Sequence, residues 1–215
     1  MTIVIGAEAA KMAGLLVDTL QKARQGQITL EQWEWFNGLT KEGRERFLRT
    51  IDPRYFVMST FTFKVPDDYG HATQLAKFKR MHGSDFVFYN NDITDEHFAG
   101  VTTKLIPGKV YTVKLIGITS GSVVSSEDNL AVLRQHRAIL VGAQGLSVVY
   151  KQAKEKFPKG KWVISLDEKD ACWKDASGFP RVPFMVQCLV GGWRFNLDYF
   201  GGGWNCSYCL LCLCD

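Results

Sequence analysis

The first 171 residues of this 215-residue chain contain no cysteine, and no part of it is a long uninterrupted apolar run. A membrane-spanning helix needs about 18 apolar residues in a row, whereas Glu8 and Lys11 already interrupt the apolar N-terminal segment. That segment also lacks a charged leader and a small-residue cleavage site, which disfavours a cleaved signal peptide. The sequence therefore predicts no membrane span and no visible export signal, and it leaves the cellular location open.

Recognisable catalytic motifs are missing as well. The chain has no nucleophile elbow, no zinc-protease pattern and no phosphate loop, and its histidines have no nucleophile at a recognisable spacing. The glycines at 117–121 and 142–145 lack the Lys-Ser/Thr that follows a phosphate loop, so turns are expected there. We therefore predict that the protein is not an enzyme and needs no cofactor.

The chain also lacks a concentration of charge of one sign. Its formal net charge of +4 comes from 26 basic and 22 acidic side chains, and the two signs are interleaved, as in Lys154-Glu155-Lys156. Electrostatic binding of nucleic acid needs basic residues gathered on one surface. The sequence therefore predicts no nucleic-acid partner.

Apolar periodicity divides the chain into two parts. Residues 1–52 predict a small helical segment, with helices in 7–25, after Thr29 and after Thr40. Residues 55–215 predict an α+β domain with mostly short strands and no βαβ rhythm. The expected strands are 55–65, 86–89, 110–118, 161–166 and 209–214, and the expected helices are 70–82, 127–137, capped by Ser125 or Ser126, and 145–157.

Two acidic groups admit a functional and a structural interpretation. The run Asp92-Ile-Thr-Asp95-Glu96-His97 resembles a site for a hard metal ion or for acid–base chemistry. A helix start capped by Thr94, with Asp95 and Glu96 complementing the helix dipole, is the favoured interpretation. For Asp167, Glu168 and Asp170 we favour a solvated edge where a strand meets a loop.

The last 28 residues carry five of the six cysteines. The spacing Cys206-x2-Cys209-x2-Cys212-x-Cys214 would suit zinc or an iron–sulfur cluster if the thiols converged. The leucines at 210, 211 and 213 favour an extended strand instead, on which residues three apart point to opposite faces. We therefore expect Cys209, Cys212 and Cys214 to be buried strand residues, and we predict no metal site.

Between Pro183 and Cys209, apolar anchors alternate with side chains that follow no structural pattern. The anchors are Trp193, Phe195, Leu197, Phe200 and Trp204. Residues 184–208 contain no Lys and no Glu. Substituting the adenines of an AAY asparagine codon can produce Gly, Ser, Cys, Tyr, Asp or Arg but neither Lys nor Glu, so the composition agrees with adenine-directed mutagenesis.

Several features of this C-terminal region resemble diversity-generating retroelement variable proteins, in particular the archaeal and candidate-phylum members. They are Trp173 with Ala176 and Gly178, Arg181-Val182-Pro183, Trp193-x-Phe195, and Trp204 followed by the strand that ends at Cys214. The resemblance covers about residues 55–215 and implies a C-type lectin-like fold with short antiparallel strands and two flanking helices. It implies no calcium site, because no Glu-Pro-Asn or Gln-Pro-Asp motif is present.

The resemblance further implies a non-catalytic, receptor-like protein that binds an unknown protein or surface ligand through a variable region at about 184–208. The expected ligand-binding residues are Val190, Gly191, Arg194, Asn196, Asp198, Tyr199, Gly201, Gly202, Gly203, Asn205, Cys206, Ser207 and Tyr208. A small metal- or thiol-dependent protein that uses the C-terminal cysteines is the alternative. The oligomeric state is left open.

Overall fold

The computed structural model describes residues 34, 38–40, 52–189 and 191–215. Asp52–Asp215 form one compact unit. Of the helices predicted within residues 1–52, only isolated positions belong to the described residues, and Val190 of the expected ligand site lies outside them. Among the described residues, no helix has both the length and the apolar character needed to cross a membrane.

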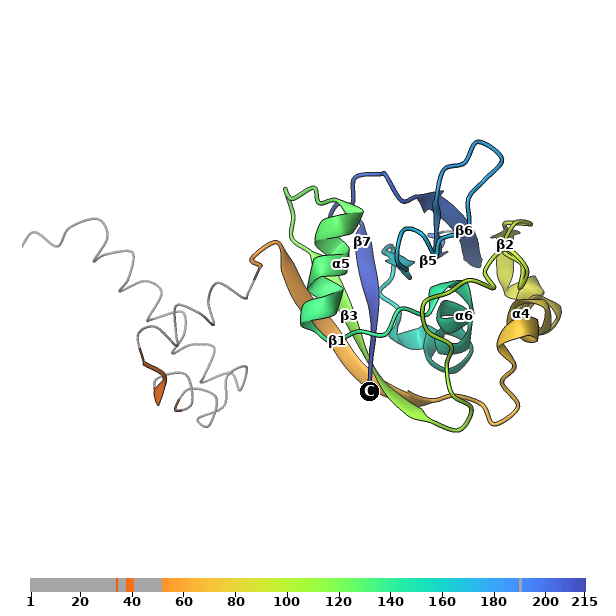
Figure 1. The fold of residues 1–215 in the computed structure, drawn as a ribbon, viewed down its shortest axis with the longest axis horizontal. Helices are drawn as coiled ribbons and strands as arrows, with labels where there is room; N and C mark the ends of the chain where they lie inside the picture. The colour runs from red at the N-terminus through yellow and green to blue at the C-terminus, as the bar shows by residue number, and fades with distance from the viewer. Residues whose placement is uncertain (1–33, 35–37, 41–51, 190) are drawn as a thin grey trace, which may run out of the picture. The chain divides into compact units, whose positions relative to one another are not determined.

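The unit is built on one mixed sheet of seven strands (Figure 1). Its order is β1-β3-β7-β4-β5-β6-β2, so the C-terminal strand lies in the interior of the sheet. Their bounds are β1 Tyr55–Lys64, β2 Phe86–Tyr89, β3 Val110–Ile118, β4 Trp162–Ile164, β5 Arg181–Gln187, β6 Trp193–Tyr199 and β7 Tyr208–Cys214. The α+β class is confirmed. Instead of purely antiparallel strands, however, β4 pairs with β7 and β2 with β6 in parallel, because each pair is joined through a long connection rather than a hairpin.

Three α-helices in the described part cover the sheet: α4 Gln74–His82, α5 Ser126–Gln135 and α6 Gly142–Ala153. Leu130 and Leu133 of α5 pack with one set of strand residues, whereas Phe78 of α4 and Leu146 of α6 pack with the other set. In Figure 1, α5 accordingly lies apart from α4 and α6. The Ser125 hydroxyl caps α5 through a capping box with Asp128, as the sequence predicts.

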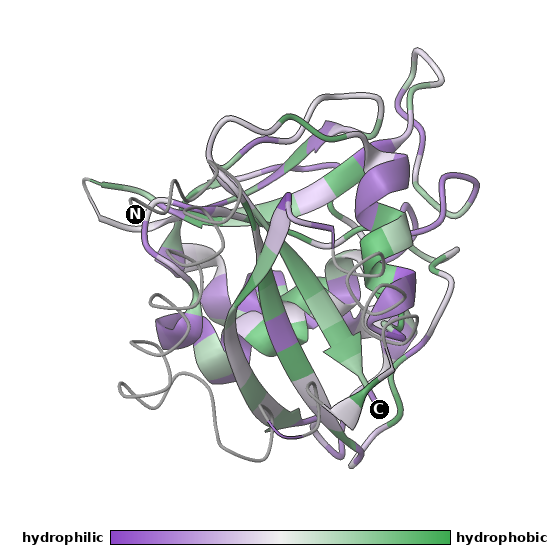
Figure 2. Ribbon diagram, turned by 90° about the vertical axis from the view of Figure 1, so that its left-hand side faces the viewer, coloured by the Kyte–Doolittle hydropathy of each residue, from purple (hydrophilic) through white to green (hydrophobic). Residues whose placement is uncertain are grey.

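The terminal strand β7 separates two cores. Cys209, Leu211 and Leu213 pack on the side of α4 and α6. Leu210 and Cys212 pack on the side of α5. The expectation that Cys209 and Cys212 point to opposite faces is confirmed, and apolar residues are frequent along the strands at the centre of Figure 2.

The glycine turns expected at 117–121 and 142–145 are only partly found. Gly117 lies inside β3, and Gly142 to Gly145 form the first turn of α6. A Cβ atom on Gly145 would stand 2.0 Å from Cγ2 of Val141, and one on Gly117 would stand 2.8 Å from the Phe56 ring. These glycines therefore allow close packing, a tertiary requirement that local sequence does not express.

The predicted strand 161–166 is also shorter and differently buried than its alternation suggests. Only Trp162–Ile164 pair as strand β4, and burial continues through Val163, Ile164, Ser165 and Leu166 without alternating. Trp162, which alternates in the sequence with Ile164 and Leu166, is 36% exposed although those two residues are buried. A strand covered on both faces loses the period-2 pattern, which explains the error.

Two acidic residues have roles that the sequence did not indicate. Residues 95–100 form turns rather than a helix, although the Thr94 hydroxyl oxygen accepts the His97 N–H at 3.2 Å as the predicted cap would. The Asp95 carboxylate accepts the backbone N–H groups of Leu75 (2.8 Å) and Ala76 (3.0 Å) at the start of α4. Asp167 is buried rather than solvated, and it accepts hydrogen bonds from the N–H and hydroxyl of Thr102. Burial raises the pKa of the Asp167 carboxyl.

Candidate ligand-binding site

Strand β6 carries buried anchors and exposed polar side chains in alternation. Trp193 and Phe195 are buried toward α4 and α6, where the Phe195 ring meets the Phe78 ring edge-to-face at 6.1 Å. Arg194 is exposed, and Asn196 is half-buried on the opposite face of the sheet. Strand geometry alone therefore separates residues that support the fold from residues that face solvent.

Buried aromatics also anchor the connection from β6 to β7. Phe200 and Trp204 are buried against the core that contains α5. The Trp204 indole N–H donates a 2.8 Å hydrogen bond to the Ser126 hydroxyl oxygen, and that hydroxyl in turn donates to the Phe200 carbonyl. Trp204 also exchanges backbone hydrogen bonds with Val124 at 2.9 Å in each direction. A glycine-rich segment is thereby fixed at two points.

We define the display face as Trp162, Arg194, Asn196, Asp198 and Tyr208. The register of β4, β6 and β7 places these side chains on one face of the sheet, because each alternates with a neighbour that packs toward α4 and α6. The Tyr208 hydroxyl donates to the Asp198 carboxylate at 3.0 Å. The Tyr208 ring stands edge-on to both Trp162 (5.2 Å) and Trp204 (4.9 Å). The display face is therefore aromatic on β4 and β7 and polar on β6.

Tyr199 does not belong to the display face. It lines a separate hollow of about 480 Å³, which we call the ring hollow. The hollow is lined by Glu127, Lys169, Phe179, Pro180, Tyr199, Phe200, Gly201 and Gly202. The two most accessible rings, Phe179 (56% exposed) and Tyr199 (48%), lie edge-to-face at 6.0 Å. The sequence-predicted set thus splits into two surfaces.

A single carboxylate orders one wall of the ring hollow. Asp175 accepts hydrogen bonds from Arg181 Nε (2.9 Å) and from the backbone N–H groups of Ser177 (2.9 Å) and Phe179 (3.0 Å). The Arg181 guanidinium lies 3.6 Å from the centre of the Tyr199 ring. The Phe179 backbone hydrogen bond, followed by the Arg181 contacts, holds the pKa of Asp175 below its usual range despite partial burial.

The remaining expected residues differ in their freedom to vary. A Cβ atom on Gly201 would meet nothing within 4 Å, whereas one on Gly203 would stand 3.0 Å from Val123. Gly191 has a φ of +92°, which L-residues rarely adopt. The Asn205 side chain accepts the Ser207 N–H at 2.8 Å, and Lys161 donates to the Cys206 carbonyl. Asn205, Cys206 and Ser207 therefore help to fix the turn that leads into β7.

Sequence reasoning missed three contributors. Trp162, Asp175 and Phe179 are absent from the ligand-binding residues expected from the sequence. The one available signal was the Asp-x-x-Gly-Phe-Pro run at 175–180, a turn pattern that ends on an exposed aromatic. Neither its proximity to Tyr199 nor the exposure of Trp162 can be inferred without the tertiary structure.

The six cysteines do not gather into one cluster, although the sulfur atoms of Cys212 and Cys214 lie 3.6 Å apart. All six are free, and no group of three or more His, Cys, Asp or Glu side chains within the described ranges is placed to hold a metal ion. Burial raises the pKa of the Cys172 and Cys209 thiols to about 12. The Cys212 pKa is also raised, mainly by burial. These thiols are therefore protonated at neutral pH and are poor ligands and nucleophiles.

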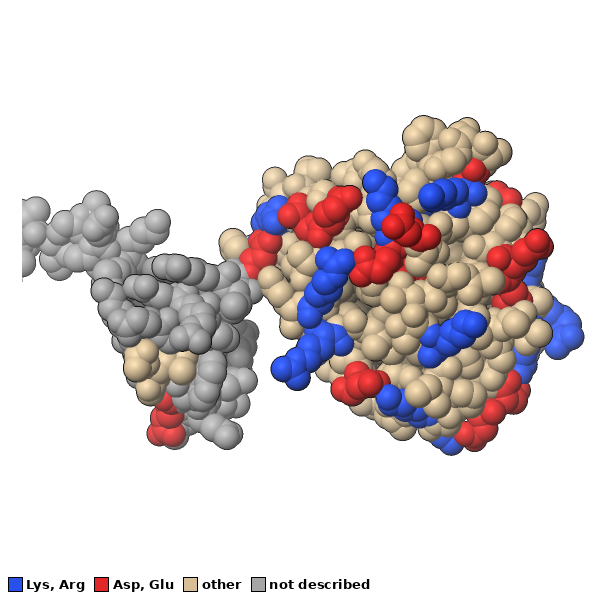
Figure 3. All heavy atoms as spheres, viewed as in Figure 1, with Lys and Arg blue, Asp and Glu red and all other residues tan. Residues whose placement is uncertain are grey.

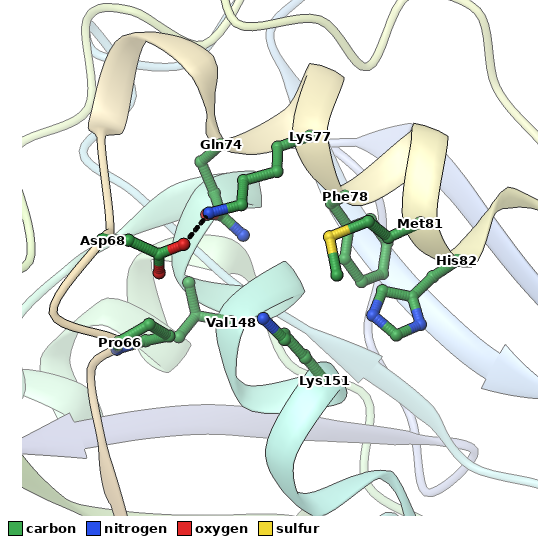
Figure 4. Close-up of a pocket in the computed structure, with 9 residues that line it drawn as sticks. All are labelled: Pro66, Asp68, Gln74, Lys77, Phe78, Met81, His82, Val148 and Lys151. Carbon is green, nitrogen blue, oxygen red and sulfur yellow. Dashed lines mark hydrogen bonds and ion pairs between the residues drawn. The ribbon is translucent and has the colours of Figure 1, made fainter.

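A second hollow, of about 310 Å³, lies beside Phe157, Gln187 and Trp193. The pocket of Figure 4, between α4 and α6, encloses about 10 Å³, roughly the space for one water molecule. Asp68 and Lys77 form an ion pair at its mouth. Figure 3 shows basic and acidic side chains interleaved over the face in view, with no single-sign stripe there.

Comparison with known proteins finds no matching family model, and neither a curated protein nor a solved structure shows a significant match.

Proposed function

We propose that the protein is a non-catalytic binding protein whose ligand contacts the display face and the ring hollow, and whose contact residues are diversified by a retroelement. The observation that carries the proposal is the division of labour along 193–204. Trp193, Phe195, Phe200 and Trp204 are buried, while the residues between them are exposed or half-buried. A site that tolerates many side chains must not use those side chains for folding.

The chemistry of the exposed residues supports recognition of another macromolecule. Trp, Tyr and Arg are enriched among the residues that dominate protein–protein binding energy. Trp162 and Tyr208 supply such rings on the display face, with Arg194 exposed beside them. Their positions on strands fix them better than a free loop would, which lowers the entropy lost on binding.

The proposal includes a C-type lectin-like arrangement. Two features support it: the C-terminal strand β7 pairs with β3 in the sheet interior, and α5 and α6 precede β4 to β7 in the chain. The third helix, α4, and the continuous seven-stranded sheet are additions to the two helices and small sheets implied by the resemblance.

Two displayed libraries test the scaffold–display division. One library randomises Arg194, Asn196, Asp198, Tyr199 and Gly201, and the matched library randomises Trp193, Phe195, Phe200, Trp204 and Leu210. We expect most members of the first library, and few of the second, to remain protease-resistant. Equal survival of the two libraries would overturn the proposal.

The diversification itself has a genomic test. We expect a near-copy of the coding sequence for about 184–208, differing opposite adenines, near a reverse transcriptase gene. A locus without such a copy would remove the retroelement from the proposal but not the binding function. Elemental analysis tests the thiol-dependent alternative, since stoichiometric zinc or iron in the purified protein would favour it.

A further inference from the structure

We propose that the ring hollow binds the side chain of a tyrosine on a protein partner, a ligand class that deepens the proposed function and rests on it. The hollow's volume of about 480 Å³ exceeds a single ring and falls within the range of roughly 300–1,000 Å³ typical of specific ligand sites. It therefore has room for a ring together with part of the peptide that carries it.

The lining suits an aromatic ring. Phe179 and Tyr199 meet edge-to-face at 6.0 Å and leave about half of each side chain accessible, and Pro180 and Phe200 complete the apolar surface. Aromatic rings prefer offset-stacked or edge-to-face contacts with other rings. A third ring in the hollow would extend an arrangement that the protein already presents.

The charged lining residues favour a phenol over an unsubstituted ring. Glu127 contributes a hydrogen-bond acceptor and Lys169 a donor to the same hollow. A phenolic hydroxyl is both donor and acceptor and can use the two groups together, whereas an indole N–H is a donor only. This hydrogen-bond complementarity favours tyrosine over phenylalanine and tryptophan.

The side of the hollow formed by Phe179 and Tyr199 is held in place by hydrogen bonds within the protein itself. Asp175 fixes the backbone of Phe179 at 3.0 Å and the guanidinium of Arg181 at 2.9 Å, and Arg181 covers the Tyr199 ring at 3.6 Å. Asp175 and Arg181 are thus positioning residues. Phe179, Arg181 and Asp175 lie outside about 184–208, whereas Tyr199 and Gly201 lie inside it. Residues outside the variable region would accordingly contact the tyrosine ring of the partner, while Tyr199 and Gly201 would determine which neighbouring partner residues are accepted.

The test titrates the full chain with N-acetyl-L-tyrosinamide, followed by NMR. We expect saturable millimolar binding, at least about tenfold weaker in Phe179→Ala and in Gly201→Trp, whose new side chain would enter the hollow. The matched control Phe56→Ala removes an exposed phenylalanine (47% exposed) on β1, away from the hollow, and should bind as the parent does.

Probe chemistry and a positioning variant complete the test. N-acetyl-L-phenylalaninamide should bind more weakly than the tyrosine probe, and methyl β-glucoside should not bind. In Asp175→Asn, the Arg181 side-chain proton resonances should lose their ring-current shift as tyrosinamide binding weakens. Equal binding of the phenylalanine probe, preferred binding of the glucoside, or tyrosinamide binding that survives Gly201→Trp would overturn the inference. The library experiment above would be unaffected by any of these results, so the two proposals can fail separately.

Discussion

The indole nitrogen of Trp204 lies 2.8 Å from the hydroxyl oxygen of Ser126, and both side chains are buried. A glycine-rich loop that would otherwise have little to hold it is thereby fastened to the first turn of α5. This hydrogen bond explains how the segment between β6 and β7 can expose variable residues while its backbone keeps one conformation. It also identifies the position at which truncation should be most damaging.

Trp204→Ala should lower the free energy of unfolding by about 3–5 kcal/mol, as expected for deleting a large buried aromatic side chain. Tyr199→Ala removes a side chain that is 48% exposed and should cost much less, about 0.5 kcal/mol plus a part of the Arg181 contact. Chemical denaturation of both variants measures the difference. The reverse ranking would mean that scaffold and display residues have been exchanged.

Tyr208, expected from the sequence to be a ligand-binding residue, should affect stability more than an exposed residue without partners. Its ring packs against two tryptophans, and its hydroxyl bonds Asp198 at 3.0 Å. We expect Tyr208→Phe to cost about 0.5–1.5 kcal/mol through the lost hydrogen bond, and Tyr208→Ala to cost more. Denaturation midpoints of the two variants test this order.

The same tyrosine contributes to the pH dependence of stability. Burial, followed by the nearby Asp198 carboxylate, raises the pKa of Tyr208 to about 12, above its ordinary value of about 10. As the pH rises, the unfolded chain therefore loses this proton before the folded protein does. The contribution of Tyr208 to the free energy of unfolding is complete below a pH of about 10 and is lost as the pH rises to about 12. Tyr208→Phe should reduce the fall in stability across that window, and an unchanged slope would contradict the assignment.

The six thiols should react in two classes. Cys188, Cys206 and Cys214 are partly exposed, whereas Cys172, Cys209 and Cys212 are buried with raised pKa values. A disulfide reagent applied to the native protein should modify the three partly exposed thiols first and the three buried thiols only after unfolding. Mass spectrometry of the modified peptides assigns the sites. Fast labelling of Cys209 in the native protein would show that β7 is not in the sheet interior.

Two glycines of the expected variable region make a matched pair. Gly201→Ala adds a Cβ atom to open space, whereas Gly191→Ala forces an L-residue to a φ of +92°. We expect the first change to be neutral or slightly stabilising and the second to cost about 1 kcal/mol or more. Comparable thermal midpoints for the two variants would contradict this distinction.

Local patterns in the sequence predicted much of the fold correctly. The predicted strand 55–65 became β1, Tyr55–Lys64, and Ser125 caps α5. The Leu-rich tail became β7, with Cys209 and Cys212 buried on opposite faces, whereas Cys214, expected to be buried, is only half-buried on the same face as Cys212. In each case the signal lies within a few neighbouring residues, because pleat and capping geometry are local properties of the chain.

Alternation along the sequence was enough to identify Trp193 and Phe195 as buried anchors, since alternate residues of a strand point to the same face. Leu197, predicted as a third anchor of this strand, is only half-buried. Which exposed residues share a surface depends on the tertiary structure. It joined Tyr208 to Asp198, set Tyr199 beside Phe179 instead, and exposed Trp162. These contacts depend on strand order and on the parallel pairing of β4 with β7, which involve residues far apart in the chain. Local sequence patterns therefore do not predict these contacts.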